Sequence, residues 1–231
     1  MRRLFVFLLV VLFIGGCSHT NELMKYDLEG KGAYYEVLIS PKTRTIQVEL
    51  NVPPDKKGDN ITDVLETVAS VSSAILSAEK ISKIKDWINT EDLTYSIVSG
   101  LKDALETYAD FSETDRRKEA DFIVITELEE CILNVNKDNV HVSIKANAKI
   151  IDRASGNIVW ENWETDTVPV GYGTGTGRKV TSGAAAKVLT ALQLAALSKK
   201  EINECVGEAA SEVGREMGET FREDLVESRK Q

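Results

Sequence analysis

Residues 140–160 of this 231-residue chain read VHVSIKANAKIIDRASGNIVW, and this stretch decides the fold. From Val140 to Ile150, apolar and polar side chains alternate, which is the pattern of a strand with one buried face. Asp152 to Asn157 is rich in turn formers, and the apolar residues Ile158-Val159-Trp160 follow it. The stretch therefore predicts an antiparallel hairpin, with Gly156 at a positive φ in the turn.

Upstream segments add strands to this hairpin. Asp121 to Ile125 is apolar on both faces, as expected of a central strand. Ile46 to Val52 alternates with a period of two and ends at Pro53-Pro54, and Tyr34 to Ile39 fits a first strand. Together with the hairpin, these segments predict a mainly antiparallel sheet of three to five strands.

Three other regions have apolar residues at helical spacing. Ile61 to Ile88 predicts a long helical insertion after the first strands, at about residues 60–89. A second helix is expected to begin at a Thr90 cap, and from Ala184 the chain is again expected to be helical. Ser198 and Glu201 fit a capping box that opens a last amphipathic helix. The predicted fold class is α+β, with the helices packed on one face of the sheet.

The N-terminus has the pattern of a secretory signal. Arg2 and Arg3 precede the apolar run Leu4 to Ile14, which is too short for a transmembrane helix of ~20 residues. The two arginines also fit a twin-arginine export signal, although an apolar run that starts at once favours the general secretory route. Ile14-Gly15-Gly16-Cys17 resembles the lipobox of bacterial lipoproteins.

That resemblance implies cleavage before Cys17 and a lipid anchor, diacylglycerol and a fatty acyl chain such as palmitate, on this cysteine. Ser18 after the cysteine implies sorting to the outer membrane under the enterobacterial rule. We therefore expect a signal peptide over residues 1–16, a lipidated tether over 17–33, and one periplasm-facing domain over 34–231 with its helical insertion.

Charge limits the partners of the mature chain. It contains 26 Lys and Arg against 37 Asp and Glu, a formal charge of −11. An acidic surface repels phosphate backbones, so nucleic acid is not an expected partner. Besides Cys17 there are Cys131 and Cys205, which could form a disulfide in an exported protein or stay as buried thiols.

No constellation of catalytic residues stands out. The two histidines, His19 and His141, fall in the expected tether and on the polar side of a strand, and no nucleophile elbow or metal-binding motif is present. The glycine-rich segment Gly171 to Gly177 lacks the endings of the phosphate-binding motifs. The sequence predicts neither an enzyme nor a cofactor or metal site.

Trp160 and Trp163 are the candidate partner contacts. They are three residues apart, so an ideal strand sends their rings to opposite faces. One ring can then belong to the core while the other serves as a surface anchor for a partner. The alternative is that helices cover both faces of the sheet, so that both rings are buried and neither is a surface anchor.

Two motifs carry a family resemblance: Ala120-Asp121-Phe122-Ile123, and Asp152 to Trp160 with the pattern D-x-x-S-G-x-I-V-W. In this order of elements, roughly residues 45–225 resemble small α/β envelope lipoproteins with a fold like the N-terminal domain of TolB. That group includes auxiliary lipoproteins of ABC transporters, activators of penicillin-binding proteins and the curli-secretion lipoprotein. Because the motifs are structural, the resemblance implies the fold and says little about function.

Two departures narrow the expectation. A pore like that of curli secretion needs long amphipathic hairpins, whereas residues 61–88 here have helical spacing. The activator lipoproteins have a long disordered tether, and Ser18 to Ala33 is short. We expect a non-catalytic accessory or scaffold lipoprotein that binds another envelope protein or itself; the alternative is a carrier of lipid or another apolar ligand for envelope transport.

Overall fold

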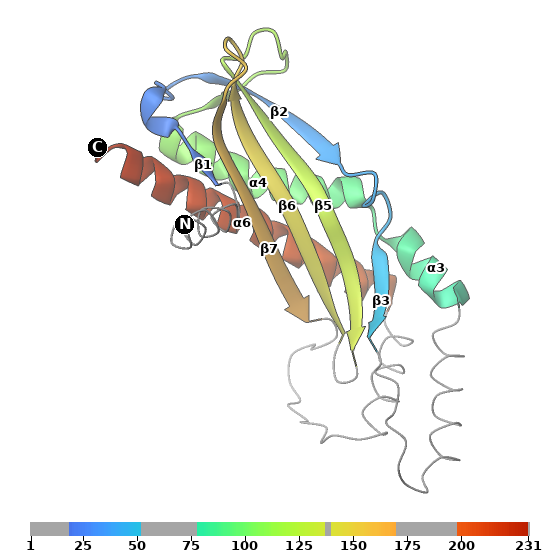
Figure 1. The fold of residues 1–231 in the computed structure, drawn as a ribbon. Coiled ribbons are helices and arrows are strands. Elements are labelled where there is room, and N and C mark those ends of the chain that lie inside the picture. Colours follow the sequence, from blue (N-terminus) through green and yellow to red (C-terminus); the bar gives the residue numbers. More distant parts are fainter. Residues whose placement is uncertain (1–18, 52–77, 137–139, 170–197, 231) are drawn as a thin grey trace, which may run out of the picture.

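Seven strands form one open sheet, and two long helices pack against one of its faces (Figure 1). The computed structural model describes residues 19–51, 78–136, 140–169 and 198–230. Its helices are the one-turn η1 (Leu23–Lys25), α3 (Ala78–Trp87), α4 (Thr90–Ala109) and α6 (Lys199–Ser228). The α+β class and the placement of helices on one face agree with the prediction.

The centre of the sheet is the antiparallel meander that the sequence predicts. It consists of β5 (Phe122–Asn136), β6 (Val140–Asp152) and β7 (Ile158–Pro169). Gly156 has a φ of 75°, as expected for the turn between β6 and β7. A register shift between Leu128 and Glu130 marks a bulge in β5, and a second shift lies opposite Val159.

The remaining strands extend the sheet on both sides. On one side β2 (Gly32–Ile39) and β3 (Gln47–Asn51) pair one after the other with β5, both parallel to it. Beyond β2 lies β4 (Ser112–Glu113), and on the far side β1 (Thr20–Asn21) pairs with β7. The strand order is β1-β7-β6-β5-β2-β4, with β3 beside β5.

The expected count of three to five strands was therefore too low. The two additional strands, β1 and β4, are two residues long, so neither carries a recognisable alternation in the sequence. The two longest ladders, β5–β6 and β6–β7, are antiparallel, which fits the predicted character of the sheet.

The core lies between the sheet and the helices. One face of β6 is fully buried, from Val142 through Ile144 to Ile150. Helix α4 adds Ile97, Leu101 and Leu105, and α6 adds a long apolar stripe. Its largest members are Met217, Phe221 and Leu225. The apolar side chains of the alternating strands and those of the helical stripes thus form a single buried layer.

Helix starts agree with the sequence to within one residue. The Ser198 and Glu201 capping box of α6 is present in both directions. For α4 the cap is Asn89 rather than Thr90: the Asn89 side chain accepts a hydrogen bond from the Glu91 amide, and Thr90 is the first helical residue. Asn and Thr are both good caps, so their order in the sequence could not decide between them.

Two other expectations are affected by the bounds of the elements. The strand predicted over Asp121 to Ile125 continues as β5 to Asn136, so it also contains Glu127, Glu129 and Glu130. Of the helical insertion, α3 is helical as predicted, while residues 52–77 lie outside the described part. The helix expected from Ala184 also falls outside it, up to residue 197.

Residues 19–33, which the sequence analysis assigns to a tether, pack on the sheet and on α6. Leu23 and Leu28 are only 2% and 5% exposed and belong to the core. The Glu22 amide donates to the Val159 carbonyl, extending the β1–β7 pairing. The packed part of the chain therefore includes residues as early as His19, two positions after Cys17.

Candidate functional site

Trp160 and Trp163 leave β7 on opposite faces of the sheet, as their spacing predicts. Trp160 is fully buried and packs edge-on against Phe221, with ring centroids 5.7 Å apart. Its Nε1–H donates to Asp224 Oδ2 at 2.7 Å, and His19 Nε2 lies 2.9 Å from the same oxygen. Trp160 is therefore a core residue that also helps to fasten the N-terminal segment to α6.

Trp163 is half-buried on the opposite face, which we call the open face because α4 and α6 pack on the other side (Figure 1). Its Nε1–H donates to Glu129 Oε1 at 3.1 Å. Glu129 Oε2 in turn lies 2.8 Å from Lys145 Nζ. These three residues, from β7, β5 and β6, form the Trp163 cluster.

A second polar group on the open face lies beside the Trp163 cluster. Lys149 Nζ is 2.9 Å from Glu161 Oε1, and Asn147 donates to Glu161 and to the Asn162 carbonyl. Asn147 and Glu161 are only 3% and 7% exposed. Charges that are paired across strands at this burial stabilise the register of the face and leave few free donors for a small ligand.

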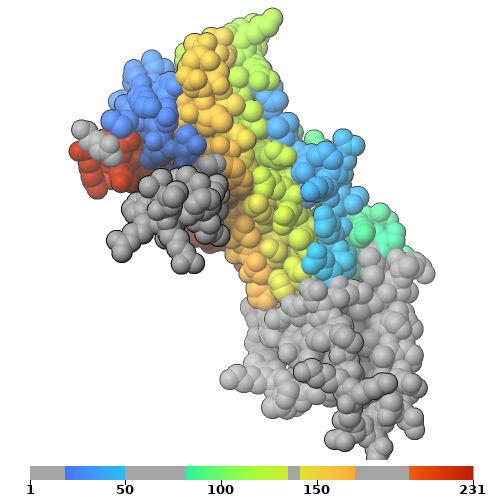
Figure 2. Space-filling model, in the orientation of Figure 1, coloured from blue at the N-terminus to red at the C-terminus, as the bar shows by residue number. Residues whose placement is uncertain are grey.

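The open face is the side turned to the viewer in Figure 2, where β5, β6 and β7 run side by side down the molecule. Where β2 joins it, Leu38 is 40% exposed. A half-buried indole with its N–H already bonded presents mainly its apolar ring to a partner. Such a ring, on a face that it shares with paired charges and with Leu38, suits contact with another protein.

The other candidate residues from the sequence are not brought together. Cys17 and the Gly171–Gly177 segment lie outside the described residues. Cys131 and Cys205 are free thiols, and burial raises the pKa of the Cys131 thiol to about 12. His141 is half-buried on the open face of β6, whereas His19 pairs with Asp224 far from it in the sheet.

Searches for other kinds of site cover the described residues alone. In that part of the chain, no three His, Cys, Asp or Glu side chains converge as metal ligands would. None of its helices has the length and apolarity needed to cross a bilayer.

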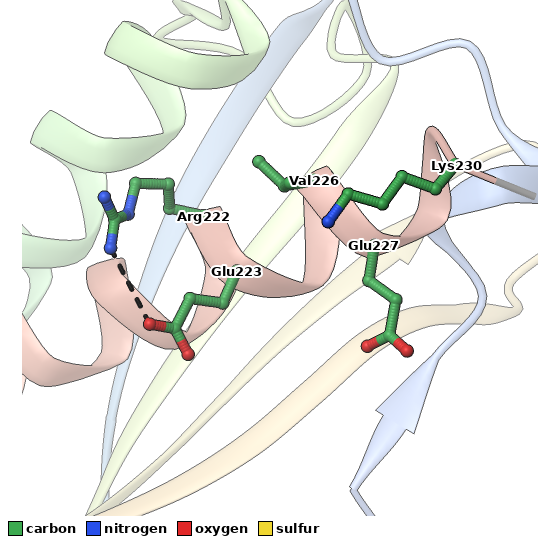
Figure 3. Close-up of a pocket in the computed structure, with 5 residues that line it drawn as sticks. All are labelled: Arg222, Glu223, Val226, Glu227 and Lys230. Carbon is green, nitrogen blue, oxygen red and sulfur yellow. Dashed lines mark ion pairs between the residues drawn. The ribbon is translucent and has the colours of Figure 1, made fainter.

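Two surface hollows of the described part lie along α6. The larger, of about 500 Å³, is lined by Arg222, Glu223, Val226, Glu227 and Lys230. Figure 3 shows that four of them come from the last turns of α6 and that Lys230 lies just past its end. Arg222 and Glu223 are paired at 3.7 Å. The smaller, of about 320 Å³, lies between α4 and α6 and includes Asp103, Arg215 and Glu219. Charged linings of this kind suit neither a lipid chain nor another apolar ligand.

Sequence reasoning missed Glu129 as the hydrogen-bond partner of Trp163, and Lys145 as the ion-pair partner of Glu129. The alternation of Glu127 and Glu129 with apolar neighbours was a signal that β5 continues, but the pairing of Glu129 with Lys145 depends on the bulge at Leu128/Glu130. Asp224 was also missed. It lies in a charged stretch of α6, and no sequence pattern indicates that its carboxylate accepts a hydrogen bond from the Trp160 indole.

No protein-family model and no curated protein matches the chain. Several solved structures are similar to it. A Xanthomonas campestris protein of the DUF330 family has a TM-score of 0.40 at 12% identity, covering 89% of this chain and 90% of that one. The hypothetical protein CT253 from Chlamydia trachomatis has a TM-score of 0.40 at 10% identity, with coverages of 84% and 98%. Lipoprotein GNA1162 from Neisseria meningitidis has a TM-score of 0.23 at 11% identity, with coverages of 70% and 94%. These scores and identities are too low to carry an argument about function.

Proposed function

We propose that the chain is a bacterial envelope lipoprotein, anchored by lipid on Cys17, that serves as a non-catalytic accessory or scaffold component of a transport or assembly complex. We propose an outer-membrane location with the domain facing the periplasm. The observation that carries the proposal is the Trp163 cluster. An aromatic ring fixed by hydrogen bonding on a polar sheet face is the kind of anchor that protein interfaces use.

The start of the fold supports a role close to the membrane. Two residues of extended chain span at most ~7 Å, so a lipid on Cys17 would hold a domain that is folded from His19 onward against the bilayer surface. A partner of such a domain would have to be a membrane protein or another protein held near the same membrane. The acidic charge of the mature chain leaves membrane attachment to the lipid itself.

Nothing in the described residues favours the carrier alternative. Both hollows have charged linings, and the space between the sheet and α6 is filled by Trp160, Met217 and Phe221. Native mass spectrometry of the purified full chain would test this alternative directly. Copurified lipid in stoichiometric amount would favour the carrier over the scaffold.

The interaction is tested with Trp163→Ala in the full chain, expressed in its own cells and crosslinked there before purification. We expect the variant to keep the wild-type melting temperature to within a few degrees and to weaken partner capture by ~2 kcal/mol or more, as a hot-spot residue does. Tyr95→Ala is the matched control, because Tyr95 is an aromatic residue of α4 that is 55% exposed on the opposite side of the sheet. Undiminished capture by a correctly folded Trp163→Ala variant would show that the open face is not the interface.

The anchor and the absence of catalysis have separate tests. Cys17→Ser should leave an uncleaved precursor and abolish labelling by a fatty-acid probe. Unchanged labelling would refute the anchor and the location with it. Saturable binding of ATP in calorimetry would contradict a purely structural role.

A further inference from the structure

In the part of the chain that the structure describes, the outer edge of β7 has no strand partner over most of its length. β1 pairs with β7 only at Trp160 and Glu161, and β7 continues to Pro169. Among the described residues, no other strand lies on that side of β7. An unpaired edge presents a row of backbone donors and acceptors that can pair with another extended chain.

The backbone groups that face this edge can be identified. The Glu22 amide donates to the Val159 carbonyl, so Val159 points toward the β1 side. Both backbone groups of a residue in an antiparallel strand point to the same side, and the side alternates along the chain. The residues that follow in the same phase past Glu161 are Trp163, Thr165 and Thr167.

The local arrangement leaves most of these groups available. The Thr167 amide already donates to its neighbour Asp166 Oδ1 at 2.7 Å. Thr165 and Thr167 are exposed, and Trp163 is half-buried. The available stretch thus runs from Trp163 to Thr167, long enough for a short added strand.

The edge is strongly acidic on the side toward α6. Glu164 and Asp166 of β7 lie near Glu216 of α6, and Glu212 precedes Glu216 by about one turn of the same helix. Burial, together with the charges of Asp166, Glu164 and Glu212, raises the pKa of the Glu216 carboxyl above its usual value. Arg215 pairs with Glu212 and Glu219 instead of with Glu216.

Glu164 is also held in place beside the edge. Its Oε1 accepts hydrogen bonds from Asn162 Nδ2 at 2.7 Å and from Thr220 Oγ1 at 2.9 Å. A fixed carboxylate next to a row of free backbone groups favours a partner strand whose side chains are cations.

We propose that the edge of β7 from Trp163 to Thr167 binds, by strand addition, an extended lysine- or arginine-bearing segment of a partner protein. This inference rests on the proposed function and specifies which kind of segment of the partner would bind. Backbone pairing would supply much of the affinity, and Glu164, Asp166 and Glu216 would select the basic sequence. A second copy of this chain is disfavoured, because edge-to-edge pairing of two β7 strands would bring the same carboxylates together.

The test uses the full chain in detergent and two short synthetic peptides, blocked at both ends. In one, lysine alternates with valine; in the other, glutamate replaces lysine. Binding is followed by tryptophan fluorescence, and hydrogen exchange is followed at the amides of Trp163 and Thr165. We expect only the lysine peptide to bind, with slower exchange at those two amides and with weaker binding at high salt.

Substitutions distinguish the contribution of the backbone hydrogen bonds to peptide binding from that of the carboxylate charges. Thr165→Pro removes one edge amide and is compatible with an edge strand, so it should weaken binding ~10-fold or more. Thr165→Ala keeps the amide and should change binding less than ~2-fold. Asp166→Asn combined with Glu216→Gln should weaken binding ~5-fold at low salt and should shift the preference away from lysine.

Several outcomes overturn the proposal. Equal binding of both peptides, or equal affinities of the Thr165→Pro and Thr165→Ala chains, would remove the edge as the site. Edge amides already protected in the free chain would mean that its own residues occupy the edge. A dimer that Thr165→Pro dissolves would assign the edge to a second copy. A failed acylation test on Cys17 would instead refute the anchor and leave the peptide result standing.

Discussion

Trp160 and Trp163 show how a spacing of three residues along a strand places two indole rings on opposite faces of a sheet. Trp160 contributes its whole surface to the core, and its N–H satisfies Asp224, which would otherwise be a poorly solvated carboxylate. Trp163 is bonded to Glu129 on the opposite face, where its ring can meet a partner. Replacing Trp160 should therefore unfold the domain, whereas replacing Trp163 should affect binding.

At Gly156 the turn between β6 and β7 requires a conformation that most residues avoid. Its φ is 75°, and a Cβ added there would meet no atom within 4 Å, so the cost of a substitution is backbone strain alone. We predict that Gly156→Val lowers the free energy of unfolding by ~1–3 kcal/mol, measured by urea denaturation. Gly156→Asn should cost much less, because asparagine tolerates this region. Equal stabilities of the Val and Asn variants would show that strain is not what fixes the turn.

Asp152 stabilises the same turn through its charge. Its Oδ2 accepts from the Ser155 amide at 2.8 Å and from the Ser155 hydroxyl, and these bonds hold the pKa of the carboxyl below its usual value. A group with a lowered folded-state pKa stabilises the protein above its unfolded pKa of ~3.9, and this contribution is lost as the pH falls through the folded value. Asp152→Asn should therefore be less stable than wild type at pH ~7, and the difference should shrink as the pH falls below ~3.9. A difference that persists in acid would assign the effect to shape instead of charge.

Among the elements, those with a long, regular period were predictable and those set by tertiary pairing were not. The alternation from Val140 to Ile150 predicted β6, and the capping box predicted the start of α6. The parallel pairing of β2 and β3 with β5 could not be predicted, because parallel and antiparallel ladders leave the same alternation in a sequence.

The candidate site was predictable in the same uneven way. The spacing of the two tryptophans was sufficient to place their rings on opposite faces. The Glu129–Lys145 pair and the acidic edge of β7 were not, because both depend on the register and on how α6 lies beside β7. The sequence of a strand does not show which residue of a neighbouring element a charged side chain will pair with.

The contact between α4 and α6 depends on glycines. A Cβ at Gly214 would lie 2.4 Å from the Ile97 carbonyl oxygen, and one at Gly100 would lie 2.6 Å from the Gly214 backbone. The two helices therefore approach at backbone distance, and any side chain there must push them apart. Such overpacking disturbs the apolar layer that both helices share with the sheet.

We predict that Gly214→Ala destabilises the protein by ~1–3 kcal/mol, measured by chemical denaturation. Gly207→Ala is the matched control in the same helix, because nothing lies within 4 Å of its added Cβ. That control should be neutral or stabilising by up to ~1 kcal/mol, since alanine is the better helix former. If both substitutions stabilised α6 equally, the close contact of the helices would be refuted.

On the scale of the whole molecule, the N-terminal segment joins the proposed anchor to both layers of the fold. His19 and Asn21 contact Asp224 of α6, while Thr20 and Asn21 pair with β7. Leu23 then enters the core. With the lipid that we propose on Cys17, a domain fastened in this way would have little freedom to move away from the bilayer, and its partners would be those near the membrane.

This arrangement predicts that residues 19–25 are part of the cooperative unit. A chain that begins at Tyr26 should unfold with ~2–4 kcal/mol less free energy than one that begins at His19, because it loses the burial of Leu23 and the cover over Trp160 and Asp224. The loss should appear in urea denaturation followed by the fluorescence of the buried Trp160.

Two single substitutions in the longer chain identify the cause. Leu23→Ala should reproduce most of the loss, at ~2–4 kcal/mol, because the side chain is 2% exposed. Met24→Ala, at a neighbouring side chain that is 57% exposed, should change stability by less than ~0.5 kcal/mol. If the two chain lengths were equally stable, residues 19–25 would be a tether after all, and the domain could then reach partners well away from its own membrane.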